Sequence, residues 1–219
     1  MATAAEPGED GDGTSVWIAG RPTAPARRRG EGGSAAGRER IAAAAVRLLD
    51  ADGPARFSMR RLAAGLGVTA MSLYWYVDTK HDLLELALDR ALGELPAPPR
   101  GGAGREGWPD RLRMLARGYR QVLADHPWVA PLAAAYPHPG PHARALDAAL
   151  DRLLDSAGLD DAGRAGAHLA VRQFLRGCGG PARPVPEGDF SRALDVLIAG
   201  ISATAAAARP RQGPGPAAR

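Results

Sequence analysis

The chain is poor in several residue types from which other kinds of site are built. Cys178 is the one cysteine among 219 residues, which excludes an internal disulfide and a cysteine-cluster metal site. No apolar run reaches the roughly 18 residues that a membrane span needs. The first residues are acidic and contain no apolar core, so they do not form a secretory signal. These absences predict a soluble cytoplasmic protein with no membrane partner.

The residues that are present favour helices. Hydrophobic residues make up 45% of the chain and many of them are alanine, whereas aromatic residues make up 5%. Alanine has the highest helix propensity, and the scarcity of β-branched and aromatic residues argues against an extensive sheet. The periodic segments have helical spacing, and no internal repeat is visible. The sequence therefore predicts an all-α protein.

Positive charge is concentrated in the first part of the chain. The formal net charge is +4, and from Arg21 to Lys80 eleven basic residues stand against five acidic ones. Lys80 is the only lysine of the chain. A balance of this kind permits nucleic-acid binding without establishing it.

Residues 58–80 carry the most informative pattern, two short apolar runs on either side of Gly67. A glycine suits the left-handed end of a first helix, which Ser58 is placed to cap, and Thr69 is placed to cap a second. Two short helices joined by a turn with glycine form a helix-turn-helix. The alternative is an ordinary hairpin in a bundle, but residues 74–76 are consecutive aromatics and cannot all face one core.

Composition and periodicity divide the chain into two helical parts. Residues 1–36 form a Gly-, Pro- and Arg-rich arm that is predicted to be disordered, and the arm either enters a DNA groove or is a solvated tail. A three-helix unit with the helix-turn-helix occupies residues 37–95, and a Pro/Gly-rich linker occupies residues 96–107. A second helical unit spans residues 108–208, and a disordered tail spans residues 209–219.

Catalysis and metal binding have little support in the sequence. His138 and His142 are four residues apart, but the prolines between them forbid a helix that would share one face, and no third ligand is visible. Cys178 has no evident base nearby in sequence, and no serine lies in a nucleophile-elbow pattern. We therefore predict no catalytic residue, metal site or cofactor.

Residues 35–95 resemble the N-terminal DNA-binding domain of the tetracycline-repressor (TetR) family. The segments that match are Arg60–Ala63, Leu66–Val68, Ser72–Val77, Lys80 and Leu83–Leu84. The region from Trp108 through His126 to the last helix resembles that family's C-terminal domain more loosely. The resemblance implies a homodimer that binds a palindromic operator in double-stranded DNA and releases it when a small effector enters the C-terminal domain.

The resemblance also assigns roles to residues of the helix-turn-helix. Arg60 matches a residue that reads a base edge, where an arginine can bond both major-groove acceptors of a guanine. Lys80 matches a phosphate-contacting lysine at a helix N-terminus. The remaining residues face the groove or the backbone. The predicted DNA-contacting set is Ser58, Arg60, Thr69, Ala70, Met71, Ser72, Tyr74, Trp75, Tyr76 and Lys80.

The chain departs from the repressor that gives the family its name at two places. Ala70 and Met71 replace a glutamine and a proline early in the recognition helix, so a different operator is expected. Leu115 and Ala133 occupy the positions of its drug-binding asparagine and metal-linked histidine, and its other drug-binding histidine falls near Pro96. A magnesium–tetracycline effector is therefore not expected.

An apolar pocket for an apolar or aromatic effector is predicted between the helices from Trp108 to Arg176. The alternative for each wall residue is that it fills the core. The dimer interface is predicted from residues 160–176 and 189–208, where small side chains allow close helix approach. The predicted effector residues are Trp108, Leu112, Leu115, Tyr119, Trp128, Tyr136 and Phe174, and the predicted interface alanines are Ala165, Ala167, Ala170, Ala193 and Ala199.

Three functions remain open at this point. The leading hypothesis is a transcriptional repressor that an effector releases from DNA. The second is a DNA-binding regulator or activator that has no effector. The third, far less favoured, is a helical enzyme or protein-interaction module, which would not bind DNA.

Overall fold

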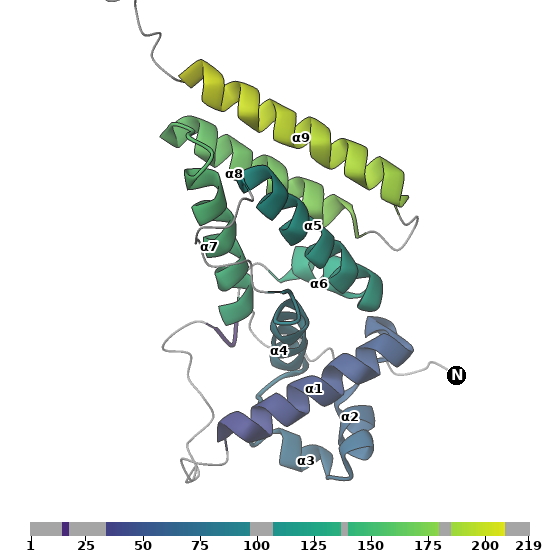
Figure 1. The fold of residues 1–219 in the computed structure, drawn as a ribbon. Helices are drawn as coiled ribbons and strands as arrows, with labels where there is room; N and C mark the ends of the chain where they lie inside the picture. The colour runs from purple at the N-terminus through teal and green to yellow at the C-terminus, as the bar shows by residue number, and fades with distance from the viewer. Residues whose placement is uncertain (1–14, 18–33, 97–106, 137–139, 180–184, 209–219) are drawn as a thin grey trace, which may run out of the picture. The chain divides into compact units, whose positions relative to one another are not determined.

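The computed structural model describes residues 15–17, 34–96, 107–136, 140–179 and 185–208, and within these ranges it contains helices and no strand (Figure 1). The predicted all-α fold is confirmed. The helices are α1 (Ser34–Asp52), the 3₁₀ turn η1 (Pro54–Arg56), α2 (Met59–Leu66), α3 (Ala70–Leu73), α4 (Lys80–Leu92), α5 (Trp108–Asp125), α6 (Val129–Ala135), α7 (Pro141–Asp155), α8 (Asp161–Gly177) and α9 (Glu187–Ala208).

The described residues belong to two compact units. The first unit comprises those within Met1–Ala91 and Leu132–Gly140, and the second comprises those within Leu92–Pro131 and Pro141–Arg219. The first unit thus takes in the C-terminal half of α6, which sequence reasoning assigned to the C-terminal part. Most of the predicted arm and linker, and the whole predicted tail, lie outside the described residues.

The core of the first unit forms between α1, α2, α3 and α4. The apolar face of α1 is buried, with Ala45 and Leu49 almost fully enclosed. Phe57 enters this core directly after η1, and Leu62 and Leu73 bring α2 and α3 onto it. Since α2 and α3 have eight and four residues, this packing has to supply most of their stability.

Two short parts of the predicted arm lie within the described residues. Helix α1 begins at Ser34, and Ser15–Trp17 form a turn on the first unit. The Ser15 hydroxyl and the Val16 amide both donate to Oε2 of Glu85, each at 2.8 Å. Ser15 and Glu85 are buried, so this segment is held because it satisfies a buried carboxylate of α4.

The second unit is a layered helical bundle. Helix α5 buries its predicted face from Leu112 to Leu123, and it packs on α7 and α8. Asp160 caps α8, with its carboxylate accepting from the Gly163 amide at 2.7 Å. Figure 1 shows α8 and α9 side by side, and Phe190, which is fully buried, stacks on Phe174 of α8 with ring centroids 5.4 Å apart.

Helix α9 leaves much of its surface uncovered. By length and composition alone it could cross a membrane, a test that core helices of soluble proteins also pass, and 28% of the relevant window is buried. Val196 is 74% exposed on α9, and Leu169 is 60% exposed on α8. Exposed apolar patches often mark interaction surfaces.

Candidate nucleic-acid interface and effector pocket

The turn between α2 and α3 has the conformation that the sequence predicts. Ser58 caps α2 by accepting from the Arg61 amide, at 3.3 Å. Gly67 ends α2 in the left-handed region, with φ 66° and ψ 28°. Thr69 caps α3 by accepting from the Ser72 amide, at 3.2 Å. These caps satisfy helix-end amides on both sides of a sharp turn, which is the geometry of a helix-turn-helix.

The second helix of this motif is very short. It has regular α-helical bonding only over Ala70–Leu73. The chain continues in a tight turn in which the Tyr76 and Val77 amides both donate to the Leu73 carbonyl, at 2.9 and 3.2 Å. A bond three residues back tightens the last turn of a helix, so the aromatic residues lie on a turn and not on a full helix.

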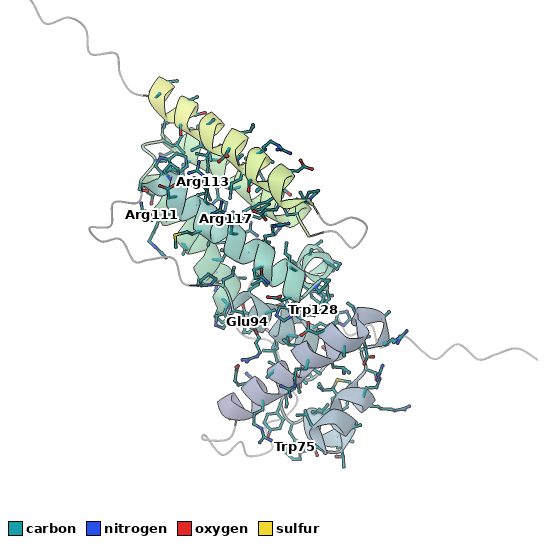
Figure 2. The ribbon with its side chains drawn as sticks, turned by 45° about the vertical axis from the view of Figure 1, so that its right-hand side comes forward. Trp75, Glu94, Arg111, Arg113, Arg117 and Trp128 are labelled. Carbon is teal, nitrogen blue, oxygen red and sulfur yellow. The ribbon has the colours of Figure 1, made fainter. Side chains whose placement is uncertain are left out.

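Several side chains of this turn are exposed although they are apolar or aromatic. Met71 is 71% exposed, Trp75 55% and Tyr74 40%, whereas Leu73 and Val77 are buried. Figure 2 shows Trp75 at the outer edge of this unit. Of the other predicted contacts, Arg60 and Thr69 are exposed, and Ser58, Ala70, Ser72, Tyr76 and Lys80 are half-buried.

Lys80 is the first residue of α4, directly after a capping box. The Asp82 amide donates to the Thr79 hydroxyl at 3.1 Å, and the Asp82 carboxylate accepts from the Thr79 and Asp78 amides at 3.1 and 2.9 Å. These reciprocal bonds form a capping box. Three amides around this terminus are therefore already bonded, so Lys80 itself has to supply most of any attraction for a phosphate.

The predicted effector residues are divided between the two units. Leu112, Leu115, Tyr119 and Trp128 are buried in the second unit, where Trp108 and Phe174 are half-buried. Tyr136 belongs to the first unit, where its ring lies 5.8 Å from the His81 ring. Tyr136 follows α6, whose last residues belong to the first unit, and its effector role stays a prediction.

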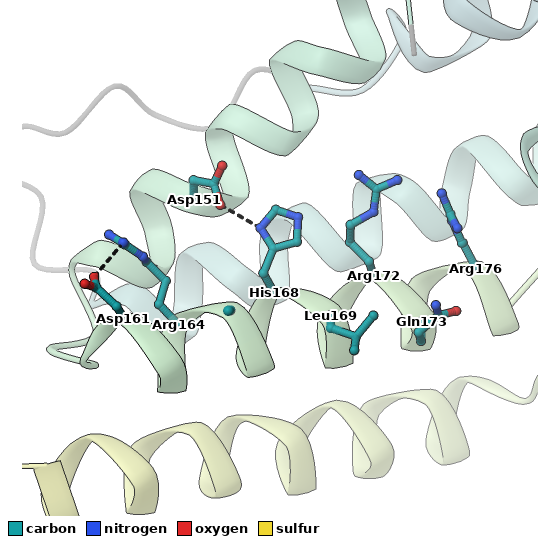
Figure 3. A pocket seen from close by; sticks show the side chains of 9 residues that line it. Asp151, Asp161, Arg164, His168, Leu169, Arg172, Gln173 and Arg176 are labelled. Atoms are coloured by element: carbon teal, nitrogen blue, oxygen red, sulfur yellow. Dashed lines mark hydrogen bonds and ion pairs between the residues drawn. The ribbon is translucent and has the colours of Figure 1, made fainter. Parts of the chain in front are cut away.

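Two open cavities of the second unit are lined by other residues. One, of about 570 Å³, lies beside α5 and the end of α8, where Arg117, Arg120 and Cys178 line it. The other, of about 590 Å³, runs along α8 (Figure 3). None of the seven predicted effector residues lines either of them.

The cavity along α8 is bordered by a ladder of polar contacts with α7, two ion pairs and a histidine–carboxylate hydrogen bond. Figure 3 shows basic side chains following one another along one edge of α8. The pairs are Arg164 with Asp155 at 2.7 Å, His168 Nδ1 with Asp151 at 2.6 Å, and Arg172 with Asp147. Helices α7 and α8 pack on each other, so the ladder ties them together along their lengths.

The reactive side chains of the described residues are held by structural contacts. The Cys178 thiol donates to the Phe174 carbonyl at 3.1 Å, and burial raises the pKa of this thiol. His126 Nε2 lies 3.1 Å from a carboxylate oxygen of Glu94. Within the ranges that the structure describes, no group of three or more His, Cys, Asp or Glu residues is arranged to hold a metal ion.

Two contacts between α1 and the helix-turn-helix were not predicted from the sequence. The Arg38 guanidinium donates from Nε to the Tyr76 carbonyl at 3.3 Å, and the Tyr76 ring lies against Gly37. A glycine near the start of an alanine-rich helix was the available signal, since glycine weakens a helix unless something approaches its backbone closely.

Comparison with known proteins gives a consistent result for both units. Residues 41–87 match the model of bacterial regulatory proteins of the tetR family, and residues 97–179 match the tetracyclin repressor-like C-terminal domain. An HTH-type transcriptional regulator of Saccharopolyspora erythraea is 42% identical over 64% of this chain and 58% of its own length. The HTH-type transcriptional repressor DrrR1 of Streptomyces coeruleorubidus is 40% identical over 48% of this chain and 38% of its own.

Solved structures agree with the sequence relatives. Apo ActR from Streptomyces coelicolor superimposes with a TM-score of 0.68 at 26% identity, over 78% of this chain and 97% of ActR. BioQ bound to its double-stranded DNA operator gives 0.64 at 27% identity, over 76% and 98%. ActR in complex with actinorhodin gives 0.65 at 25% identity, over 77% and 97%. The helix-turn-helix geometry, both family matches and these relatives lead to one conclusion: the chain belongs to the tetR family of bacterial regulatory proteins, which are transcriptional regulators and not enzymes.

Proposed function

We propose that this protein is a cytoplasmic repressor that binds a palindromic DNA operator through its helix-turn-helix. The observation that carries this proposal is the exposed set Met71, Tyr74 and Trp75, which extends from a motif whose core is made by the buried side chains of Leu62, Leu73 and Val77. Exposed side chains of this size, on a turn fixed by two caps and a left-handed glycine, suit a groove and its sugar-phosphate walls. The relative named as a repressor and the operator-bound BioQ support the same function.

The contacts divide into two kinds. Arg60 is exposed near the start of α2 and supplies base readout, since its fork fits the two acceptors of a guanine. Residues 69–72 lie against the groove. Tyr74 and Tyr76 offer hydroxyls to phosphates, Trp75 packs on sugar or a thymine methyl, and Lys80 neutralises a phosphate.

Two substitutions separate these roles. Arg60→Ala should relax sequence preference at one base pair of each half-site, with a loss of about 1–3 kcal/mol for the preferred base. Lys80→Ala should weaken binding to all sequences about equally and reduce the salt dependence by about one counterion per protomer. Equilibrium binding across a set of half-site variants and salt concentrations measures both. Two variants that bind like the wild type would show that the interface lies elsewhere.

We further propose a homodimer formed by α8 and α9. Four of the five predicted interface alanines are exposed, whereas Ala167 is buried within the protomer. Together with Leu169 and Val196 they give these helices an apolar, small-residue surface suited to a four-helix interface. Sedimentation of Val196→Asp should show dissociation. Met114→Asp is the control, because Met114 is 45% exposed on α5, outside the proposed interface.

The release of DNA by an apolar or aromatic effector is supported by the ActR complexes with actinorhodin and (S)-DNPA. Thermal-shift screening with aromatic polycyclic compounds, followed by DNA competition, tests it. A compound that stabilises the protein and also displaces DNA supports an effector-released repressor. The burial of Leu112, Leu115 and Tyr119 in a packed core favours the alternative, an effector-independent regulator or activator, and that alternative predicts no such compound.

A further inference from the structure

The start of α1 makes an unusually close approach to the DNA-facing turn. Gly37 lies in the second turn of α1, where a side chain would collide with the Tyr76 ring. A Cβ built on Gly37 would lie 2.3 Å from Cε1, 2.9 Å from Cζ and 3.0 Å from Cδ1 of Tyr76. Real Cβ atoms essentially never approach heavy atoms this closely, so the ring occupies space that only glycine leaves open.

A glycine at this position needs an explanation. Glycine weakens a helix relative to alanine, and residues 42–45 of the same helix are all alanine. The left-handed conformation does not require it here, because the positive-φ glycines among the described residues are Gly53, Gly67 and Gly158. The Tyr76 ring supplies the reason, since any larger residue would displace it.

Helix α1 also holds the backbone of the same residue. Nε of Arg38 donates to the Tyr76 carbonyl at 3.3 Å. This carbonyl lies in the tight turn that follows α3, outside the regular hydrogen bonding of that helix. Consecutive residues of α1 therefore fix the ring of Tyr76 and its main chain.

The ring is not enclosed on every side. A cavity of about 150 Å³ lies beside it. Its lining includes Gly37, Arg40 and Ile41 of α1, Ser72 and Leu73 of α3, and Tyr76 itself. A ring next to open space can turn aside when one of its supports is altered. The contact with Gly37 and the bond from Arg38 are thus the restraints that select one ring position.

We propose that Gly37 and Arg38 are positioning residues that set Tyr76 for its contact with the DNA backbone. This inference rests on the proposed DNA-binding function and on the phosphate-facing role of Tyr76. Gly37 acts by admitting the ring, and Arg38 acts by fixing the carbonyl of the turn. Neither residue has to touch a base, so their loss lowers affinity without changing sequence preference.

The test is a double-mutant cycle on the full chain. The proteins are the wild type, Gly37→Ala, Tyr76→Ala and the double variant, and the probe is a labelled duplex of about 30 base pairs that the wild type has selected from a random pool. Gly37→Ala should weaken binding by about tenfold to a hundredfold, the effect of losing hydrogen bonds to charged groups. In the Tyr76→Ala background the same change should have no further effect.

Two more variants keep the result interpretable. Gly65→Ala is the same change in α2, where nothing lies within 4 Å of the added Cβ. This variant should not show the loss of DNA affinity that depends on Tyr76. Arg38→Gln should weaken binding in the same direction as Gly37→Ala, and it provides the measurement if Gly37→Ala does not fold by circular dichroism. Sequence preference, measured on half-site variants, should stay that of the wild type in both.

The possible results separate the positioning role of Gly37 and Arg38 from the DNA-binding function on which it rests. Gly37→Ala and Arg38→Gln binding like the wild type, while Tyr76→Ala binds weakly, would overturn the positioning role and leave the DNA-binding function intact. An equal loss from Gly37→Ala with and without Tyr76 would also overturn it. If Tyr76→Ala and Lys80→Ala both bind like the wild type, the proposed interface itself fails.

Discussion

Replacing Gly67 by alanine tests the turn that defines the helix-turn-helix. Gly67 has φ 66° and ψ 28°, a left-handed conformation that costs an L-residue roughly 1–2 kcal/mol. The smaller conformational entropy of the unfolded alanine chain offsets roughly 0.4–1 kcal/mol of this. Nothing lies within 4 Å of an added Cβ, so no steric collision contributes. The free energy of unfolding should therefore fall by about 1 kcal/mol.

A matched variant two residues earlier should change the free energy of unfolding in the opposite direction. Gly65 lies within α2, its φ is not positive, and nothing lies within 4 Å of its added Cβ. Gly65→Ala should raise the free energy of unfolding by up to about 1 kcal/mol through helix propensity. Urea unfolding followed by circular dichroism measures both changes, and each kcal/mol corresponds to about 2–4 °C in Tm for a chain of this size.

A stabilising effect of Gly67→Ala would refute the proposed turn. If Gly67→Ala stabilises the protein as Gly65→Ala does, then residue 67 has ordinary helical geometry and α2 continues into α3. A continuous helix would not present residues 69–76 at an angle to α2, and the helix-turn-helix would be wrong. The same data would leave the all-α fold untouched, because that rests on the other helices.

Three further predictions concern buried groups. Burial raises the pKa of Tyr119 above its ordinary value, so the unfolded chain releases the tyrosine proton first as the pH rises. The free energy of unfolding should therefore be level up to about pH 10 and fall above it. Tyr119→Phe should lessen that fall, measured by urea titration. Burial also raises the pKa of the Cys178 thiol, so a disulfide reagent at pH 8 should react more slowly with the folded than with the unfolded protein, and equal rates would contradict this. Ser15→Ala removes one bond to Glu85 and should speed hydrogen exchange of the Val16 amide, whereas unchanged exchange would show that this turn is held by other contacts.

Local features of the motif could be predicted from the sequence because their causes lie within a few residues. Ser58, Gly67 and Thr69 each act through the backbone of their own helix end, four residues away or fewer. The capping box of Thr79 and Asp82 is local in the same sense. Such features follow from residue type and spacing, and all of them are confirmed.

The features that could not be predicted depend on contacts between distant segments. Ser15 meets Glu85 across seventy residues, and nothing in either neighbourhood signals the other. Tyr136 lies in the first unit because α6 crosses from one unit to the other, which periodicity does not reveal. The early end of α3 could not be predicted either, because the tight turn that follows it is set by the bonds from Tyr76 and Val77 to the Leu73 carbonyl, which residue type does not signal.

The most direct test of the account is selection of bound DNA from a random duplex pool by the wild-type protein, repeated at two salt concentrations. A dimer with one recognition segment in each protomer should enrich a palindrome whose half-sites are centred about 10 base pairs, or a multiple of this, apart. Binding should weaken steeply as salt rises, because phosphate contacts release counterions. Recovery of unenriched sequences, with no salt-dependent binding, would contradict the claim that residues 58–80 form a DNA-reading motif.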